Sequence, residues 1–352
     1  MVPALAVGEA LRERGAEVTF VTPRGRAGSG IAAAEGFPER HIPLRGLARR
    51  PTPRNLVALG LAALAVPRAL GLLSGRADAV VTAGGYMAAP VAVAARLLGI
   101  PLVAMEADAR LGLANRLTAP LARRVALAFP LPGRRGPRYA VTGRPVRRSV
   151  LTATRTSGRR AFGIDPDATV VLVVGGSQGA RTLNHAAVEA FGPRPPFEVI
   201  HVAGPRQIAE TATLLERAAA PGAADGDGRG GRYRLEAFLA NLPEAVAAAD
   251  LVVSRAGGSV FELAAIGRPS VLVPYPHATG DHQAGNARWL VEAGGAVLLP
   301  DAECTGPRLR ALVGALLSDR RRLTAMADCA RQVGRPEAAD RVAEMALEAA
   351  RR

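Results

Sequence analysis

The sequence predicts an α/β fold with two Rossmann-like, doubly wound domains. In each half of the chain, short apolar runs rich in valine alternate with helical patterns, which is typical of parallel sheets covered by helices. Glycine-rich turns follow several of these runs, where a parallel strand would lead into a helix. The length of 352 residues suits two domains, each large enough to bury a core.

The first half begins with an amphipathic helix predicted over Pro3–Arg14, with a proline near its start. Glu17–Thr22 is predicted to form a strand. Residues 79–83 and 101–105 have the apolar composition of buried parallel strands. Periodicity is lost over residues 148–168, which predicts a linker.

The second half restarts with a predicted strand at Thr169–Val174, a glycine turn and a helix. Five further strands are predicted at Glu198–Val202, Arg234–Ala237, Leu251–Ser254, Ser270–Val273 and Ala296–Leu299. We therefore expect a first domain over residues 1–150 and a second over 151–335. A C-terminal helix is expected over 336–352, and in this architecture such a helix commonly crosses back to the first domain.

The net charge is +15, and every basic residue is an arginine. A GC-rich genome accounts for the choice of arginine over lysine, but the excess of positive charge favours anionic partners such as a phospholipid surface or a pyrophosphate. No basic run is interleaved with aromatic residues, so no nucleic-acid partner is predicted. Cys304 and Cys329 lack metal-ligand spacing and suggest a reducing compartment. Neither a metal nor a cofactor is predicted.

Six motifs together resemble the MurG family, the peripheral glycosyltransferases of peptidoglycan synthesis. They are TAGGYMAAP (82–90), GLANRL (112–117), VTGRPVR (141–147), GGSQGA (175–180), RAGGSVFEL (255–263) and PYPHATGDHQAGNA (274–287). The resemblance runs along nearly the whole chain and implies the GT-B glycosyltransferase architecture, in which two Rossmann-like domains face a cleft. It also implies inverting transfer of N-acetylglucosamine (GlcNAc) from UDP-GlcNAc to the C4 hydroxyl of MurNAc in undecaprenyl-pyrophosphoryl-MurNAc-pentapeptide, which converts lipid I to lipid II at the cytoplasmic face of the membrane.

Two alternatives remain open. One is a related two-domain glycosyltransferase that acts on another glycolipid or a natural product. The other is a catalytically impaired homologue that binds a UDP-sugar without turnover. A nicotinamide dehydrogenase is disfavoured because the first half contains no GxGxxG motif.

The donor side is predicted in the second half. GGSQGA would direct backbone N–H groups at a phosphate, with Ser177 and Gln178 assisting, although an ordinary strand-to-helix turn has the same pattern. Glu262 would accept the ribose hydroxyls, although an acid early in a helix is also favoured by the helix dipole. The resemblance further implies these donor contacts: Gly258 and Ser259 in the turn before Glu262, Leu239 beside the uracil, Gln283 and Asn286 on the sugar hydroxyls, and Arg147 near the phosphates.

The acceptor side is predicted in the first half. Gly84, Gly85 and Tyr86 form a second glycine turn, expected to face the acceptor's pyrophosphate. Downstream, the family's His-Glu-Gln-Asn is Met-Glu-Ala-Asp here, so Glu106 is kept and an amide becomes Asp108. Asp108 would repel a diphosphate unless it is protonated or paired, and it is also a candidate base. Arg144 stands where an asparagine is common.

No catalytic residue is predicted. The family's candidate general base is a histidine in a glycine loop, and this chain begins just after the position of that loop. We expect the true start to lie upstream, with a first strand and that loop. Catalysis would otherwise rest on alignment of the substrates and on stabilisation of the phosphates.

A membrane-facing segment is predicted at Leu56–Leu73, which Pro67 and Arg68 interrupt, so that it is a poor spanning helix. Four basic residues precede it: Arg45, Arg49, Arg50 and Arg54. Basic residues beside apolar ones suit docking on an anionic membrane surface. A buried helix with a solvated basic flank is the alternative.

Overall fold

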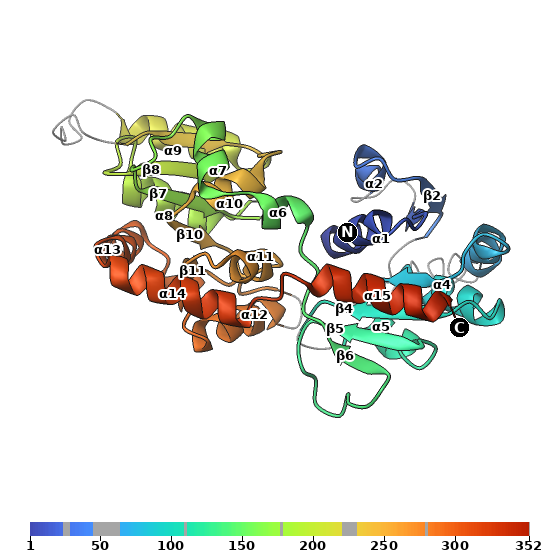
Figure 1. The fold of residues 1–352 in the computed structure, drawn as a ribbon. Coiled ribbons are helices and arrows are strands. Elements are labelled where there is room, and N and C mark those ends of the chain that lie inside the picture. Colours follow the sequence, from blue (N-terminus) through green and yellow to red (C-terminus); the bar gives the residue numbers. More distant parts are fainter. Residues whose placement is uncertain are drawn as a thin grey trace. The chain divides into compact units, whose positions relative to one another are not determined.

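The computed structural model describes residues 1–23, 29–44, 64–108, 111–176, 179–219, 231–278 and 281–351. They form two compact units (Figure 1). The first consists of Met1–Arg148 together with Arg335–Arg352, and the second of Ser149–Gly334. The prediction of a linker over 148–168 is wrong for Arg155–Phe162, which form helix α7 of the second unit. Thr154 and Ser157 cap that helix reciprocally, and Gly163 ends it in the left-handed conformation.

The first unit contains two parallel sheets. Its elements are α1 (Val2–Glu13), β1 (Phe20–Pro23), α2 (Ile31–Ala34), β2 (Glu39–Ile42), β3 (Val80–Thr82), α4 (Ala88–Leu97), β4 (Leu102–Glu106), α5 (Leu113–Thr118), β5 (Arg124–Leu127), β6 (Tyr139–Val141) and α15 (Ala338–Ala350). Strand β1 pairs with β2, and the other four strands follow the order β3-β4-β5-β6. Helix α15 packs against α1 and β4, where Val7, Met105 and Val342 belong to one buried cluster.

The second unit has one six-stranded parallel sheet in the order β12-β11-β10-β7-β8-β9. Its strands are β7 (Val170–Val174), β8 (Glu198–Val202), β9 (Tyr233–Glu236), β10 (Leu251–Ser254), β11 (Ser270–Leu272) and β12 (Ala296–Leu298). Its helices are α6 (Arg148–Thr152), which starts at the last residue of the first unit, α7, α8 (Arg181–Phe191), α9 (Ile208–Ala218), α10 (Leu242–Ala248), α11 (Ser259–Ile266), α12 (His282–Glu292), η2 (Asp301–Glu303), α13 (Gly306–Leu317) and α14 (Arg320–Val333).

Both faces of this sheet are covered. Strand β7 is buried throughout, and its side chains alternate between two separate cores. Leu172 lies in the core that includes Val260 of α11, whereas Val173 lies in the core that includes Leu183 of α8. Burial on both faces explains the continuous apolar runs that mark these strands in the sequence.

Candidate functional site

The candidate donor site lies where four strands of the second unit end. In a parallel sheet the carboxyl ends of all strands meet at one edge, so the segments after β7, β9, β10 and β11 share that edge. These segments contain most of the residues predicted to bind the donor. We call this edge the donor edge.

The turn after β7 requires glycine. Gly176 and Gly179 have φ of 84° and 78°, which side chains rarely adopt. A Cβ at Gly175 would lie 2.6 Å from the Ala180 nitrogen, and one at Gly179 would lie 2.3 Å from the Ala203 carbonyl oxygen. The turn therefore presses backbone against backbone immediately before α8. Ser177 and Gln178, predicted to contact the donor pyrophosphate, lie outside the described residues.

The turn after β10 leads into α11. Gly258 caps the helix, Ser259 is its first residue, and Glu262 lies in its first turn, half-buried. A Cβ built on Gly257 would meet no atom within 4 Å, so open space adjoins this turn. The Ser259 hydroxyl donates to the Arg255 carbonyl at 3.4 Å. The start of α11 thus has backbone N–H groups beside open space, with one acidic residue in the same helical turn.

Arg255 fixes this turn to its neighbours, a role that the sequence reasoning missed. Its buried guanidinium donates to the carbonyl of Val273 at 3.2 Å and to the Asp301 carboxylate at 2.5 Å. It also lies over the ring of Tyr275. Its place at the start of RAGGSVFEL, directly after a buried strand, was the available signal. Arg255 therefore joins the segments that follow β10, β11 and β12.

Asn286 and Gln283, predicted to bind sugar hydroxyls, both brace loops. Asn286 is 1% exposed, and its amide nitrogen donates to the Ala256 carbonyl at 3.2 Å. Its amide oxygen is buried and has no hydrogen-bond partner among the residues that the structure describes. The Gln283 side-chain oxygen accepts from the Tyr275 backbone nitrogen at 2.9 Å. These contacts tie α12 to the turns after β10 and β11.

Leu239, predicted to flank the uracil, packs partly buried against a core of the second unit. Its neighbour Phe238 is 70% exposed. Both residues follow β9 at the donor edge. An exposed ring beside a fixed leucine offers a surface on which a base could stack.

In the first unit, the second glycine turn lies beside the end of β4. Gly84 and Gly85 have φ of 74° and 76°, and Tyr86 follows them, half-buried. A Cβ on Gly84 would lie 3.1 Å from the amide nitrogen of Asn115. That nitrogen donates to the Met105 carbonyl at 2.8 Å and to the Glu106 carboxylate at 2.9 Å.

Glu106 is buried and accepts three N–H groups. Besides Asn115, the backbone nitrogens of Asp108 and Gly112 donate to it at 3.1 and 2.8 Å. The predicted acceptor residue therefore shapes the loop after β4. Asn115 was not singled out from the sequence, although it stands inside the GLANRL motif.

Asp108 has a cationic partner. Its carboxylate lies 3.8 Å from the guanidinium of Arg144, which also donates to the Ala107 carbonyl at 3.2 Å. Two of the positions at which this chain departs from the family pattern therefore lie together. Pairing removes part of the repulsion expected between Asp108 and a diphosphate.

Arg147, predicted to lie near the donor phosphates, forms ion pairs within the first unit. Its nitrogens lie 2.6 Å from carboxylate oxygens of both Glu9 and Glu35. The hydrogen bond to Glu35 is the largest contribution that raises the pKa of Arg147, and Glu9 adds to it. The same bond lowers the pKa of Glu35. Contact with a phosphate would require this network to open.

Among the described residues, no three histidine, cysteine or acidic side chains gather in a group able to hold a metal ion. Within the same residues, no helix is long and apolar enough to cross a bilayer. Part of the predicted membrane-facing region lies outside the described residues, namely Arg45, Arg49, Arg50, Arg54 and residues 56–63. Residues 64–73 of the same segment are helical.

Comparison with known proteins supports one family. Residues 1–127 match the glycosyltransferase family 28 N-terminal domain, and residues 170–342 match its C-terminal domain. A UDP-N-acetylglucosamine–N-acetylmuramyl-(pentapeptide) pyrophosphoryl-undecaprenol N-acetylglucosamine transferase of Rubrobacter xylanophilus is 39% identical over 98% of this chain and 99% of its own. The transferase of the same name from Acidothermus cellulolyticus is 40% identical over 99% of this chain and 94% of its own.

Solved structures agree. Acinetobacter baumannii MurG superposes with a TM-score of 0.73 at 29% identity, covering 99% of this chain and 95% of its own. A UDP-GlcNAc 2-epimerase from Neisseria meningitidis, bound to UDP-GlcNAc, has a TM-score of 0.69 at 13% identity, covering 99% of this chain and 96% of its own, which indicates a shared fold alone. The predicted α/β fold of two domains with parallel sheets is confirmed as GT-B. The chain belongs to the MurG family of glycosyltransferases, within glycosyltransferase family 28.

Proposed function

We propose that this chain transfers GlcNAc from UDP-GlcNAc to the C4 hydroxyl of MurNAc in undecaprenyl-pyrophosphoryl-MurNAc-pentapeptide, converting lipid I to lipid II in peptidoglycan synthesis. The observation that carries the proposal is near-complete alignment, at 39% identity, with a transferase named for this reaction. The architecture of the donor edge supports it independently. Two strand-to-helix turns with several glycines there lead into α8 and α11.

In the proposed mechanism, the donor diphosphate lies against the starts of α8 and α11. Their backbone N–H groups and positive dipole ends offset the charge that develops on UDP as it leaves. Ser177 and Gln178 contact the same diphosphate, together with Gly258 and Ser259. Glu262 accepts hydrogen bonds from the ribose hydroxyls, and Leu239 borders the uracil.

Gln283 and Asn286 are proposed to set the sugar specificity. Each already fixes a loop at the donor edge, and the buried oxygen of Asn286 has no hydrogen-bond partner within the described part of the chain. A sugar hydroxyl or N-acetyl N–H placed there would complete it, and a sugar unable to donate would leave it unpaired. Such unpaired groups give strong discrimination between substrates.

The acceptor side is proposed to consist of Gly84, Gly85 and Tyr86, held against the end of β4 by Asn115 and Glu106. The Arg144–Asp108 pair joins the segment after β6 to the loop after β4, in which Asp108 and Gly112 donate to Glu106. Arg147 enters the proposal with a changed role: it positions the segment after β6 through Glu9 and Glu35.

We further propose that the first unit docks on the cytoplasmic face of the membrane, at an anionic surface. Leu113 and Leu117 project from α5 and are 68% and 61% exposed, with Arg116 between them in the sequence. Leu97 of α4, a helix that packs on α5, is 67% exposed. Exposed apolar side chains next to a cation suit shallow insertion between anionic headgroups.

The test is release of UDP from UDP-GlcNAc with a lipid I analogue, measured for the wild type, Glu262→Gln and the control Glu292→Gln. Loss of a hydrogen bond to a charged group should raise the KM for UDP-GlcNAc by roughly tenfold or more in Glu262→Gln. Glu292 lies exposed at the end of α12, so its variant should match the wild type. Release with a different glycolipid only would favour the related glycosyltransferase. Binding of UDP without any release would favour a homologue that does not turn over.

A further inference from the structure

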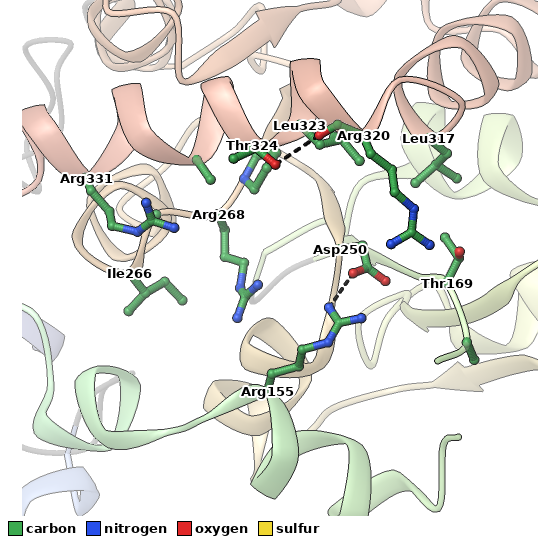
Figure 2. A pocket seen from close by; sticks show the side chains of 14 residues that line it. Arg155, Thr169, Asp250, Ile266, Arg268, Leu317, Arg320, Leu323, Thr324 and Arg331 are labelled. Atoms are coloured by element: carbon green, nitrogen blue, oxygen red, sulfur yellow. Dashed lines mark hydrogen bonds and ion pairs between the residues drawn. The ribbon is translucent and has the colours of Figure 1, made fainter. Parts of the chain in front are cut away.

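The second unit holds a cavity of about 300 Å³ that the donor edge does not use (Figure 2). One side of it is lined by residues that come just before strands β7, β10 and β11, namely Thr169, Asp250 and Arg268. Helix α14 lines the other side. Four arginines border this cavity: Arg155, Arg268, Arg320 and Arg331. We call it the arginine pocket.

The arginine pocket lies at the opposite edge of the sheet from the glycine turns. Thr169 precedes β7 and Gly175 follows it, so the five residues of that strand separate the two edges by roughly 17 Å. Helix α11 also runs from one edge of the sheet to the other. Its first residue, Ser259, belongs to the donor edge, whereas Ile266 and Gly267 at its end line the pocket. The pocket is therefore a separate place from the proposed donor site.

Asp250 is committed to two of its neighbours. Its carboxylate forms ion pairs with Arg155 and with the buried Arg159, the latter at 3.0 Å. It also accepts the backbone N–H of Val170 at 2.8 Å. One carboxylate with three donors is already satisfied, so it does not compensate the charges of Arg268 and Arg320. Arg331 has its own partner, because its guanidinium forms an ion pair with Asp328 of α14.

Arg268 and Arg320 have no ion-pair partner among the described residues. Arg268 donates one N–H to the Ala247 carbonyl at 2.7 Å, and its buried Nε has no hydrogen-bond partner in the described ranges. Burial is the largest effect on the pKa of Arg268 and lowers it. The charge of Asp250 raises this pKa, whereas the positive charges of Arg155, Arg331 and Arg159 lower it. Arg320 is exposed at the start of α14. Figure 2 shows both side chains extending toward the space that Arg155 and Asp250 also border.

This arrangement selects for a multiply charged anion. Guanidinium groups from three separate elements border one hollow, and guanidinium matches the oxygens of phosphate groups in paired hydrogen bonds. A volume of about 300 Å³ is at the small end of ligand sites, too small for a folded protein segment and sufficient for a diphosphate. We propose that the arginine pocket binds a diphosphate group, either as free pyrophosphate or on a nucleoside diphosphate.

The experiment is calorimetric titration of the full chain with pyrophosphate, with ADP and, as a charge comparison, with inorganic phosphate. Arg320→Ala and Arg331→Ala remove arginines of the pocket. Arg321→Ala removes an equal charge from the next residue of α14, which is exposed and does not line the pocket. Trp289, the single tryptophan, lies in the second unit and reports whether each variant is folded.

We expect saturable binding of pyrophosphate that weakens roughly tenfold in Arg320→Ala and in Arg331→Ala, while Arg321→Ala matches the wild type. Inorganic phosphate should bind more weakly than pyrophosphate. ADP bound as tightly as pyrophosphate would assign the site to a nucleotide, and ADP bound far more weakly would assign it to the free anion. The proposal is overturned if Arg320→Ala and Arg331→Ala bind pyrophosphate like the wild type, or if Arg321→Ala loses as much affinity as they do. Pyrophosphate bound only at the glycine turns would keep its affinity in Arg320→Ala and Arg331→Ala. A failure of the arginine-pocket proposal can therefore be distinguished from a failure of the transferase proposal.

Discussion

The guanidinium of Arg144 lies 3.8 Å from the carboxylate of Asp108, and these are two positions at which this chain departs from the family pattern. An asparagine is common at each position in the family. An exchange of both amides for an ion pair keeps the local charge near neutral, so that neither change introduces an isolated charge beside the glycine turn of the first unit. The pair is partly exposed, at 20% and 47% of the two side chains. It therefore contributes little to stability, on the order of 1 kcal/mol or less.

This pairing predicts that Asp108 is not an essential base. Asp108→Asn should keep kcat within about threefold of the wild type, because only a weak ion pair is lost. The KM for the lipid acceptor should fall or stay constant, since Arg144 would then face the diphosphate with its full charge. Steady-state UDP release at varied lipid I analogue measures both constants, with Arg144→Asn/Asp108→Asn as the charge-balanced control. A hundredfold loss of kcat in Asp108→Asn would restore the base hypothesis.

Asn115 is predicted to hold the loop that follows β4 in the first unit. Asn115→Ala removes hydrogen bonds to the Met105 carbonyl and to Glu106, which should lower the free energy of unfolding of the first unit by about 2 kcal/mol. The acceptor KM should rise, while the donor KM stays unchanged. Thermal unfolding followed by far-UV circular dichroism, together with steady-state kinetics, measures these effects. Arg123→Ala, at an exposed position before β5, is the control. An unchanged acceptor KM would mean that Asn115 only stabilises the fold.

Arg147 is predicted to be a positioning residue. Arg147→Ala leaves Glu9 and Glu35 facing each other without their shared cation, which should cost about 2 kcal/mol of stability given their partial exposure. The more exposed Arg148, paired with Glu13 at 3.5 Å, supplies the control Arg148→Ala. Calorimetric unfolding and the KM for UDP-GlcNAc distinguish a positioning role from direct contact with the donor. A raised donor KM with unchanged stability would instead place Arg147 on the donor phosphates.

The strands of the second unit were predictable from the sequence to within one residue at each end. For β7, β10 and β11, burial on both faces leaves short runs of mostly apolar residues, and the ends of these runs mark the ends of the strands. In the first unit the strand predicted over Glu17–Thr22 is Phe20–Pro23. Its limits follow from pairing with β2, and Phe20 pairs with Glu39, which is nineteen residues away. Local periodicity carries no information on such pairing.

The candidate site was predictable as motifs but not as contacts. Glycine turns and Glu262 are found at the strand ends because close backbone approach and positive φ restrict the residue type. The partners of Arg147 could not be foreseen, since Glu9 lies 138 residues away in the sequence. The same holds for Asn286, whose contact with Ala256 exists only once α12 lies over the turn after β10. The contacts of side chains that brace loops can therefore be identified only from the structure.

Membrane docking through α5 predicts a specific loss of binding. Leu113→Ser/Leu117→Ser removes two exposed apolar side chains and should reduce retention on vesicles of anionic phospholipid at low salt by tenfold or more. Sedimentation with the vesicles measures the bound fraction. Leu298→Ser, which removes a 45% exposed leucine from β12 of the second unit, is the matched control. Equal retention of all three proteins would exclude α5 as the docking surface.

His201 is predicted to make the second unit less stable in mild acid. It is fully buried on β8, and burial lowers its pKa from 6.5 to about 3. Its Nε2–H donates to the Asn184 side-chain oxygen at 3.0 Å, because the Asn184 nitrogen already donates to the Ala203 carbonyl. Its Nδ1 accepts the hydroxyl of Tyr233 at 2.7 Å. Both partners hold the neutral ring, so protonation would break this network.

The unfolded chain takes up a proton on this histidine below pH 6.5, whereas the folded protein does so only near pH 3. Stability from the neutral ring is therefore complete above pH 6.5 and is lost as the pH falls toward 3, by about 1.4 kcal/mol per pH unit. Urea unfolding followed by Trp289 fluorescence should show a drop of about that size between pH 7.5 and 5.5 beyond the drop in His201→Gln. His185→Gln, at a half-exposed histidine paired with Glu210, is the control for the loss of a histidine from the same unit. The same pH dependence in His201→Gln as in the wild type would show that other groups cause the acid sensitivity.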